Sequence, residues 1–275
     1  MTKAAEGPIR VGVGGWTFGA WRGAFYPTDL PHKRELEYMS RRLTSIEINA
    51  TFYRGQSRAS FAKWRDETPE DFVFALKGPR YATHRRTLAE AGESVERFVG
   101  GGLAELGDKL GPINWQLPPT KRFEPDDCAA FLELLPKTLD GRALRHAIEA
   151  RHDSFRTAEF VALARAKGVA IVVAGDSEYP LIADPTAAFV YARIMGTQEG
   201  KPAGYSKPAL DAWAQRAAAW AAGEAPQDLP LLAKPAAAPR GREVFLYVIS
   251  GAKALNPAAA AALIGRLQSP TSSRA

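Results

Sequence analysis

The chain has 275 residues, of which 46% are hydrophobic and 24% charged, values typical of a globular protein with a large core. Its net charge of +6 is spread along the sequence, which favours acidic partners such as phosphorylated molecules and argues against a basic nucleic-acid-binding tail. The single cysteine, Cys128, excludes an internal disulfide bond, and the lack of a signal-peptide core or a membrane-span-length apolar run predicts a cytoplasmic protein.

Short β-rich segments alternate with amphipathic helical segments along the chain. The expected strands are 9–15, 45–49, 72–77, 112–116, 146–149, 170–173, 189–194 and 243–249. The expected helices are 33–43, 57–67, 94–110, 125–135, 157–167, 208–222 and 256–267. Strands that alternate with helices pair in parallel, and eight such units over this length predict an α/β fold, a (β/α)₈ TIM-like barrel.

Two connections depart from this pattern. Between the strands 170–173 and 189–194, the sequence DSEYPLIADPT (176–186) predicts an irregular loop without a helix. A Pro/Ala-rich insertion at 223–242, before the last strand, predicts a surface loop. Because no repeat or composition change divides the chain, we expect one barrel domain over 1–275, with flexible tails at 1–8 and 269–275.

Polar residues recur on the strand face that is expected to line the barrel. Residues i and i+2 share a face, and the bulky Ile46 and Ile48 belong against the helices, so Glu47 and Asn49 face the lumen. The same alternation in the other strands directs into the lumen Lys77, Asn114, Gln116, Glu149, Tyr191 and Arg193. Because barrel enzymes build their sites at the C-terminal ends of the strands, these side chains define a candidate site.

Glu47, Glu149 and Lys77 are the catalytic candidates. Two carboxylates across a lumen can act as acid and base, and neighbouring cations favour the ionised form of a general base. Lys77 is a Schiff-base candidate, although a clamp on an anionic substrate is the stronger expectation. The structural alternative is a closed ionic network that joins the two carboxylates to Lys77 and Arg193 and only fills the lumen.

The residues expected to bind substrate lie in the strands or in the loops that follow them. Arginine forks match phosphate and carboxylate groups with paired hydrogen bonds. The expected set is Trp16, Asn49, Tyr53, Arg80, His84, Gln116, Arg151, Tyr191 and Arg193. With Glu47 and Glu149, His152 and Asp176 are weaker candidates for a Mg²⁺ or Mn²⁺ site, so the expected cofactor is none or a divalent metal ion.

Six consecutive blocks of sequence carry a family resemblance. They are VGVGGWTFGAWRGAFYP (11–27), EINATFY (47–53), FALKGPRYATH (74–84), LGDKLGPINWQLPP (106–119), AIEARHDSF (147–155) and VYARIMG (190–196). Together they resemble the domain of unknown function 72 family, the YecE-like proteins, over residues 9–250. The resemblance implies a TIM-like barrel and supplies no established activity. The chain departs from the family pattern at Met195, Ile249, Ser250 and Phe155, which argues against a mechanism that needs a histidine at position 195.

The best-supported function from sequence is an enzyme, a hydrolase, lyase or isomerase, that acts on a small anionic substrate, phosphorylated or sugar-like, by carboxylate acid/base chemistry. One alternative is a metal-assisted phosphodiesterase or a nucleic-acid-binding protein, in which Trp16, Trp21, Tyr53 and Tyr81 would stack bases along a basic rim. Packing of the long first loop is the favoured role for Trp16, Phe18, Trp21 and Phe25. Another alternative is a non-catalytic ligand-binding barrel. The sequence makes no prediction of the oligomeric state.

Overall fold

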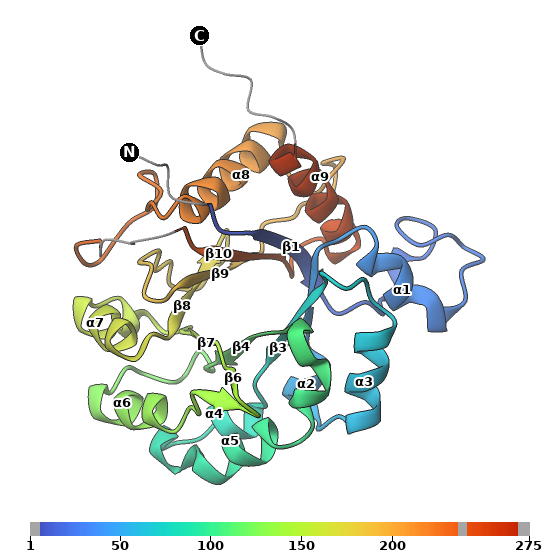
Figure 1. The fold of residues 1–275 in the computed structure, drawn as a ribbon. Coiled ribbons are helices and arrows are strands. Elements are labelled where there is room, and N and C mark those ends of the chain that lie inside the picture. Colours follow the sequence, from blue (N-terminus) through green and yellow to red (C-terminus); the bar gives the residue numbers. More distant parts are fainter. Residues whose placement is uncertain (1–5, 236–240, 269–275) are drawn as a thin grey trace.

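Eight parallel strands close into a barrel in a computed structural model that describes residues 6–235 and 241–268. Figure 1 looks along the barrel and shows the helices arranged around it. The strands are β1 (Ile9–Gly14), β2 (Ser45–Ile48), β3 (Val73–Lys77), β4 (Leu110–Gln116), β7 (His146–Glu149), β8 (Ala170–Gly175), β9 (Phe189–Ile194) and β10 (Glu243–Val248). The expected TIM-like α/β barrel is therefore confirmed, with the strands where the alternating pattern placed them.

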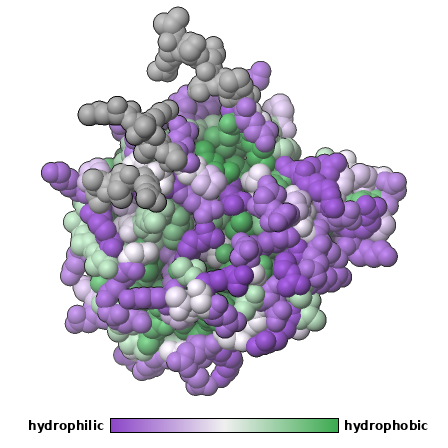
Figure 2. Space-filling model, in the orientation of Figure 1, coloured by the Kyte–Doolittle hydropathy of each residue, from purple (hydrophilic) through white to green (hydrophobic). Residues whose placement is uncertain are grey.

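The helices cover the outside of the barrel. They are α1 (Glu35–Ser40), α2 (Ala50–Tyr53), α3 (Arg58–Asp66), α4 (Arg80–Thr83), α5 (Gly92–Val99), α6 (Pro125–Glu133), α7 (Ala158–Lys167), α8 (Lys207–Ala221) and α9 (Asn256–Gln268). The side chains of Ser57, Thr157 and Ser206 cap the first turns of α3, α7 and α8 by accepting hydrogen bonds from backbone amides. The space-filling view of the same face is largely hydrophilic, with apolar areas between the charged ones (Figure 2).

Local sequence reasoning missed several short elements. The expected helix 94–110 is divided, because α5 ends at Val99 and Gly102 adopts a φ of +117° before a 3₁₀ segment over Leu103–Lys109. The short helices α2 and α4, and the hairpin of β5 (Thr138–Leu139) with β6 (Arg142–Ala143), were not expected. Elements of two to four residues are too short for a hydrophobic period to show.

The two irregular connections lie where the sequence predicted them. No helix forms over the described segment 176–188, and the described residues of the insertion, 223–235 and 241–242, contain neither helix nor strand. The buried carboxylate of Asp184 joins the two connections, because it accepts hydrogen bonds of 2.9 Å from the amides of Leu232 and Ala233. Residues 1–5 and 269–275, which make up most of the expected tails, lie outside the described residues, as do 236–240.

The side chains on the two faces of the strands belong to two different apolar clusters. The outward faces pack against the helices, and the inward faces form a separate apolar cluster that includes Val73, Val172 and Phe245. At the N-terminal end of the barrel, Glu243 forms ion pairs with Arg10 and Arg145. The polar residues at the other end of the strands form the candidate site.

Glycines on β1 let β2 and its side chains approach closely. A Cβ atom at Gly12 would lie 1.9 Å from the carbonyl oxygen of Ser45, and one at Gly14 would lie 2.5 Å from Nδ2 of Asn49. The space beside Gly14 is therefore taken by the Asn49 side chain. Among the described residues, no helix is long and apolar enough to cross a membrane.

Candidate active site

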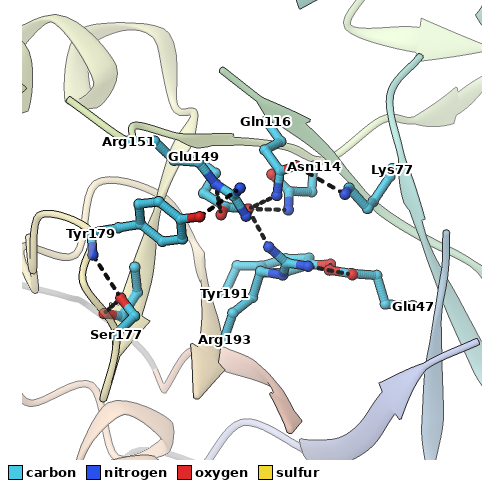
Figure 3. A network of polar contacts seen from close by, with 11 residues as sticks. Glu47, Lys77, Asn114, Gln116, Glu149, Arg151, Ser177, Tyr179, Tyr191 and Arg193 are labelled. Atoms are coloured by element: carbon cyan, nitrogen blue, oxygen red, sulfur yellow. Dashed lines mark hydrogen bonds and ion pairs between the residues drawn. The ribbon is translucent and has the colours of Figure 1, made fainter. Parts of the chain in front are cut away.

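Arg193 on β9 bridges the two buried carboxylates of the lumen, Glu47 and Glu149 (Figure 3). Its Nη1 donates a hydrogen bond to Oε2 of Glu149 at 2.6 Å, and its Nη2 donates to Oε1 of Glu47 at 3.0 Å. Burial alone would lower the pKa of the guanidinium, but the neighbouring anions more than offset this effect and raise the pKa above its ordinary value. Arg193 is therefore a permanent cation at the centre of the site.

Glu149, at the end of β7, is surrounded by donors. Its Oε2 also accepts from Nδ2 of Asn114 at 3.0 Å and from Nε2 of Gln116 at 2.9 Å, and its Oε1 accepts from Nε of Arg151 at 2.8 Å. Burial raises the pKa of Glu149, but Arg193, Arg151 and the other donors outweigh burial and lower the pKa to about 2. Glu149 therefore stays ionised at neutral pH, with its lone pairs already engaged.

Glu47 on β2 has a second donor in Tyr191 on β9. The Tyr191 hydroxyl donates to Oε2 of Glu47 at 2.6 Å, and burial together with the Glu47 charge raises the pKa of this tyrosine. Beneath it the Tyr247 ring lies 5.2 Å from the Tyr191 ring, and the hydroxyls of Tyr247 and Ser45 lie 2.7 Å apart. Glu47 therefore lies in an aromatic environment, and its charge, like that of Glu149, is balanced by the ion pair with Arg193.

Lys77, at the end of β3, has an amide and an aromatic ring as partners and no carboxylate. Its Nζ donates to Oε1 of Gln116 at 3.0 Å and lies 4.0 Å above the ring of Phe52, and it forms no ion pair with any carboxylate in the described part of the chain. Burial, and after it the charge of Arg193, lowers the pKa of Lys77 to about 8. The share of molecules with a neutral amine at neutral pH is therefore larger than for an ordinary lysine. The closed ionic network left open by the sequence forms around Arg193 without Lys77.

Arg151 completes the polar group and gives it an excess of positive charge. Its Nη1 donates to the Tyr179 hydroxyl at 3.2 Å, and its guanidinium lies 4.1 Å above the Tyr179 ring. Its side chain keeps 17% of its surface exposed, whereas both carboxylates are fully buried. With Arg193 and Lys77 it places three cations beside two carboxylates, so the site attracts an anion.

The rim of the site carries three of the expected substrate-binding residues. Tyr53 on α2 is 65% exposed, and the guanidinium of Arg80 on α4 lies 5.9 Å from its ring. The His84 ring packs 5.5 Å from the ring of Phe52, the same ring that carries the Lys77 amine. Burial, and then the nearby cations, lowers the pKa of His84. These side chains therefore form a basic, partly aromatic border next to Lys77.

The aromatic residues of the first loop have a packing role. Trp16 is half-buried and packs edge-on against Trp64 at 5.1 Å. Trp21 is 1% exposed, and its indole nitrogen donates to the carbonyl of Lys253. The packing role favoured for Trp21 is therefore confirmed, because the loop folds back and buries the ring, and the alternative in which this ring stacks a base does not hold.

The expected metal ligands do not come together. The described residues contain no group of three His, Cys, Asp or Glu side chains that could hold a metal ion. His152 pairs through Nδ1 with the Ser154 hydroxyl at 2.9 Å, and Asp176 accepts from the Trp213 indole at 2.7 Å. The prediction of His152 and Asp176 as ligands alongside the lumen carboxylates is therefore wrong: each has another partner.

Two residues of the site were missed from sequence. Phe52 supports the Lys77 amine and Tyr179 supports Arg151. Phe52 lies on the unexpected helix α2, and Tyr179 lies in the irregular loop after β8. The only available signal was the position of both residues just after an expected strand.

Two of the departures from the family pattern lie in the lumen, and a third lies in the outer core. Met195 and Ile249 belong to the inner apolar cluster, against which Tyr179 also packs. Phe155 is buried beside Phe160, with the ring centres 4.9 Å apart.

A closed β/α barrel with polar side chains gathered at the C-terminal strand ends defines a TIM-like barrel protein. The chain belongs to the family described as "Protein of unknown function DUF72", which matches residues 10–274. It is similar to the UPF0759 protein YecE of Escherichia coli strain K12, with 29% identity over 123 residues, 44% of this chain and 42% of that protein. It is also similar to the UPF0759 protein YunF of Bacillus subtilis strain 168, with 27% identity over 116 residues and 40% of each chain. The matched stretches thus span about two fifths of these relatives.

Solved structures of the same family share the fold. A DUF72 family protein from Thermotoga maritima superposes with a TM-score of 0.71 at 21% identity, covering 94% of this chain and 98% of that one. A DUF72 family protein from Enterococcus faecalis V583 gives a TM-score of 0.65 at 14% identity, covering 95% and 98%. At these identities the likeness supports the barrel fold.

Proposed function

We propose that this protein is an enzyme that acts on a small anionic carbonyl compound, phosphorylated or sugar-like, and that Lys77 is its catalytic amine. The observation that carries the proposal is the setting of Lys77 at the C-terminal end of the barrel. The amine is buried on the Phe52 ring, has one hydrogen-bond acceptor, Gln116, and has a pKa of about 8. A lysine activated in this way by burial and neighbouring cations is suited to attack a carbonyl carbon.

The two carboxylates fit a positioning role better than an acid/base role. Glu149 accepts from four donors and its pKa lies near 2, so it is a weak base whose hydrogen bonds would have to break before it could take a proton. Together with Glu47 it holds Arg193 in place, and Arg193 keeps the Lys77 pKa low.

The proposed step balances without a cofactor. The neutral Lys77 amine adds to the carbonyl carbon, the nitrogen loses its protons, and the carbonyl oxygen leaves as water, so that an imine joins enzyme and substrate. Arg151, the most exposed of the three central cations, adds positive charge beside the amine and helps to attract an anionic substrate to the mouth. The imine withdraws electrons from the adjacent carbon, which suits a lyase or an isomerase.

Reductive trapping tests this function. The protein is incubated with a panel of aldoses, ketoses and their phosphates, reduced with sodium borohydride and mapped by peptide mass spectrometry. We expect an adduct at Lys77 that is absent from Lys77→Met, and we use the exposed Lys33 as the internal measure of non-specific reaction. Labelling of Lys77 no greater than that of Lys33 with every compound would remove the amine from the mechanism.

A nucleic-acid-binding role is the second candidate. Tyr53 and Tyr81 are the large hydrophobic side chains most exposed among the described residues, at 65% and 40%, and both lie near Arg80 in sequence or space. Aromatic rings beside arginines can stack bases along a phosphate backbone. Binding of a labelled single-stranded oligonucleotide that weakens steeply with salt would support this candidate over the first.

A further inference from the structure

A basic pocket of about 380 Å³ opens beside the mouth of the barrel, between the turn after α4 and the turn after β4. We call it the basic pocket. Five of the eight residues that line it are basic, and Glu124 is its one carboxylate. The residues that form its polar wall are His84, Arg85, Arg86, Thr120, Lys121 and Arg122.

Two of the basic residues build the pocket. Arg85 donates hydrogen bonds to the carbonyls of Tyr81 and Glu90 and to the Ser94 hydroxyl, which fixes the turn after α4. Lys121 is 8% exposed and donates to the carbonyl of Arg86 at 2.7 Å and to Asp127 at 2.6 Å. Lys121 therefore ties the two turns together, and its charge is neutralised within the fold.

The side chains of Arg86 and Arg122 remain available to bind a ligand. The side chains of Arg86 and Arg122 are exposed, and neither forms a hydrogen bond or ion pair with any described residue. Two unpaired arginines that line one pocket leave it with uncompensated positive charge, which favours an anion there. The Thr120 hydroxyl and the His84 imidazole add neutral donors to the same wall. This combination suits a phosphate group, which accepts several hydrogen bonds from arginine forks and hydroxyls.

The pocket is adjacent to Lys77. The His84 ring lies 5.5 Å from the Phe52 ring centre, and the Lys77 amine lies 4.0 Å from the same centre. One aromatic ring therefore separates the pocket wall from the reactive nitrogen. A phosphorylated carbonyl compound long enough to span this ring would place one end at Lys77 and the other in the pocket.

We propose that the basic pocket binds the phosphate monoester group of the substrate while Lys77 meets the carbonyl carbon. This assignment of the substrate class rests on the proposed function, whereas phosphate binding by the pocket stands on the pocket itself. Arg86 and Arg122 are then the residues that separate phosphorylated from unphosphorylated sugars.

Calorimetric titration at low ionic strength tests the proposal with inorganic phosphate, ribose 5-phosphate and ribose. We expect ribose 5-phosphate to bind far more tightly than ribose, and the double variant R86Q/R122Q to lose at least about tenfold in affinity for both phosphate probes. The matched control K33Q/K207Q removes the same charge from exposed lysines away from the pocket and should stay within about twofold of the wild type.

The outcomes separate the two proposals. Equal phosphate affinity in R86Q/R122Q and the wild type, or no phosphate binding by the wild type, overturns the phosphate site. Loss of single-stranded oligonucleotide binding in R86Q/R122Q with no effect on either phosphate probe overturns it in favour of nucleic acid. Lys77→Met should still bind inorganic phosphate in the pocket, so failure of the trapping at Lys77 leaves this result intact.

Discussion

Arg193 on β9 donates a hydrogen bond of 2.6 Å to Glu149 on β7, across the lumen of the barrel. The same guanidinium holds Glu47 on β2 at 3.0 Å, so one cation on β9 neutralises two buried anions from two other strands. The behaviour of the site therefore depends on this bridge.

Removing the bridge should destabilise the fold. Arg193→Met leaves Glu47 and Glu149 buried without their shared cation, which costs about 3–5 kcal/mol of unfolding free energy. Urea unfolding monitored by circular dichroism measures the loss. Arg97→Met, which breaks the exposed Arg97–Glu93 pair on α5, is the control and should change stability little. Equal stability of the two variants would show that the bridge does not stabilise the barrel.

The contribution of Glu149 to the free energy of unfolding should depend on pH. Its pKa falls from the ordinary value of 4.5 to about 2 on folding, so the unfolded state binds more protons between these values and stability declines as pH falls through them. The stabilisation, on the order of 3 kcal/mol, is fully present above pH 4.5. In Glu149→Gln it is absent, so the two proteins should differ most at neutral pH and converge towards pH 2. A stability difference that stays constant over this range would contradict the assignment.

The Phe52 ring should raise the pKa of the Lys77 amine. The ring lies 4.0 Å from Nζ and stabilises the charged form by a cation–π contact. Phe52→Leu should therefore lower the Lys77 pKa further, by roughly half a unit or more. Phe52→Tyr keeps a ring in place and should retain the wild-type value. An unchanged pKa in Phe52→Leu would show that burial and Arg193 alone set it.

The alternating pattern of the strands is the part of the structure that sequence predicts well. In β2, Ile46 and Ile48 had to face the helices because the outer layer accepts only apolar side chains, and Glu47 then had to face inward. The same argument correctly placed Lys77, Glu149 and Arg193 in the lumen. It works because a shift of one residue would bury every charge against the helices.

The cation that pairs with the carboxylates inside the lumen could not be predicted in the same way. Sequence left open whether Lys77 or Arg193 would neutralise the carboxylates, because that depends on distances across the closed barrel. Tyr179 was missed since the loop after β8 has no regular period to follow. The packing of Trp21 was expected, but its partner, the carbonyl of Lys253, was not, because local patterns do not encode where a long loop folds back on the core.

The central claim is that Lys77 is a buried amine with a depressed pKa. Reductive methylation with ¹³C-formaldehyde, followed by titration of the dimethyl-lysine NMR signals, measures it directly, and Lys77→Arg identifies the resonance. We predict a midpoint near pH 8, below the ordinary 10.5, and a further downward shift in Glu47→Gln, since the Glu47 charge favours the protonated amine. A Lys77 midpoint at 10.5, equal to that of the exposed lysines, would contradict the account.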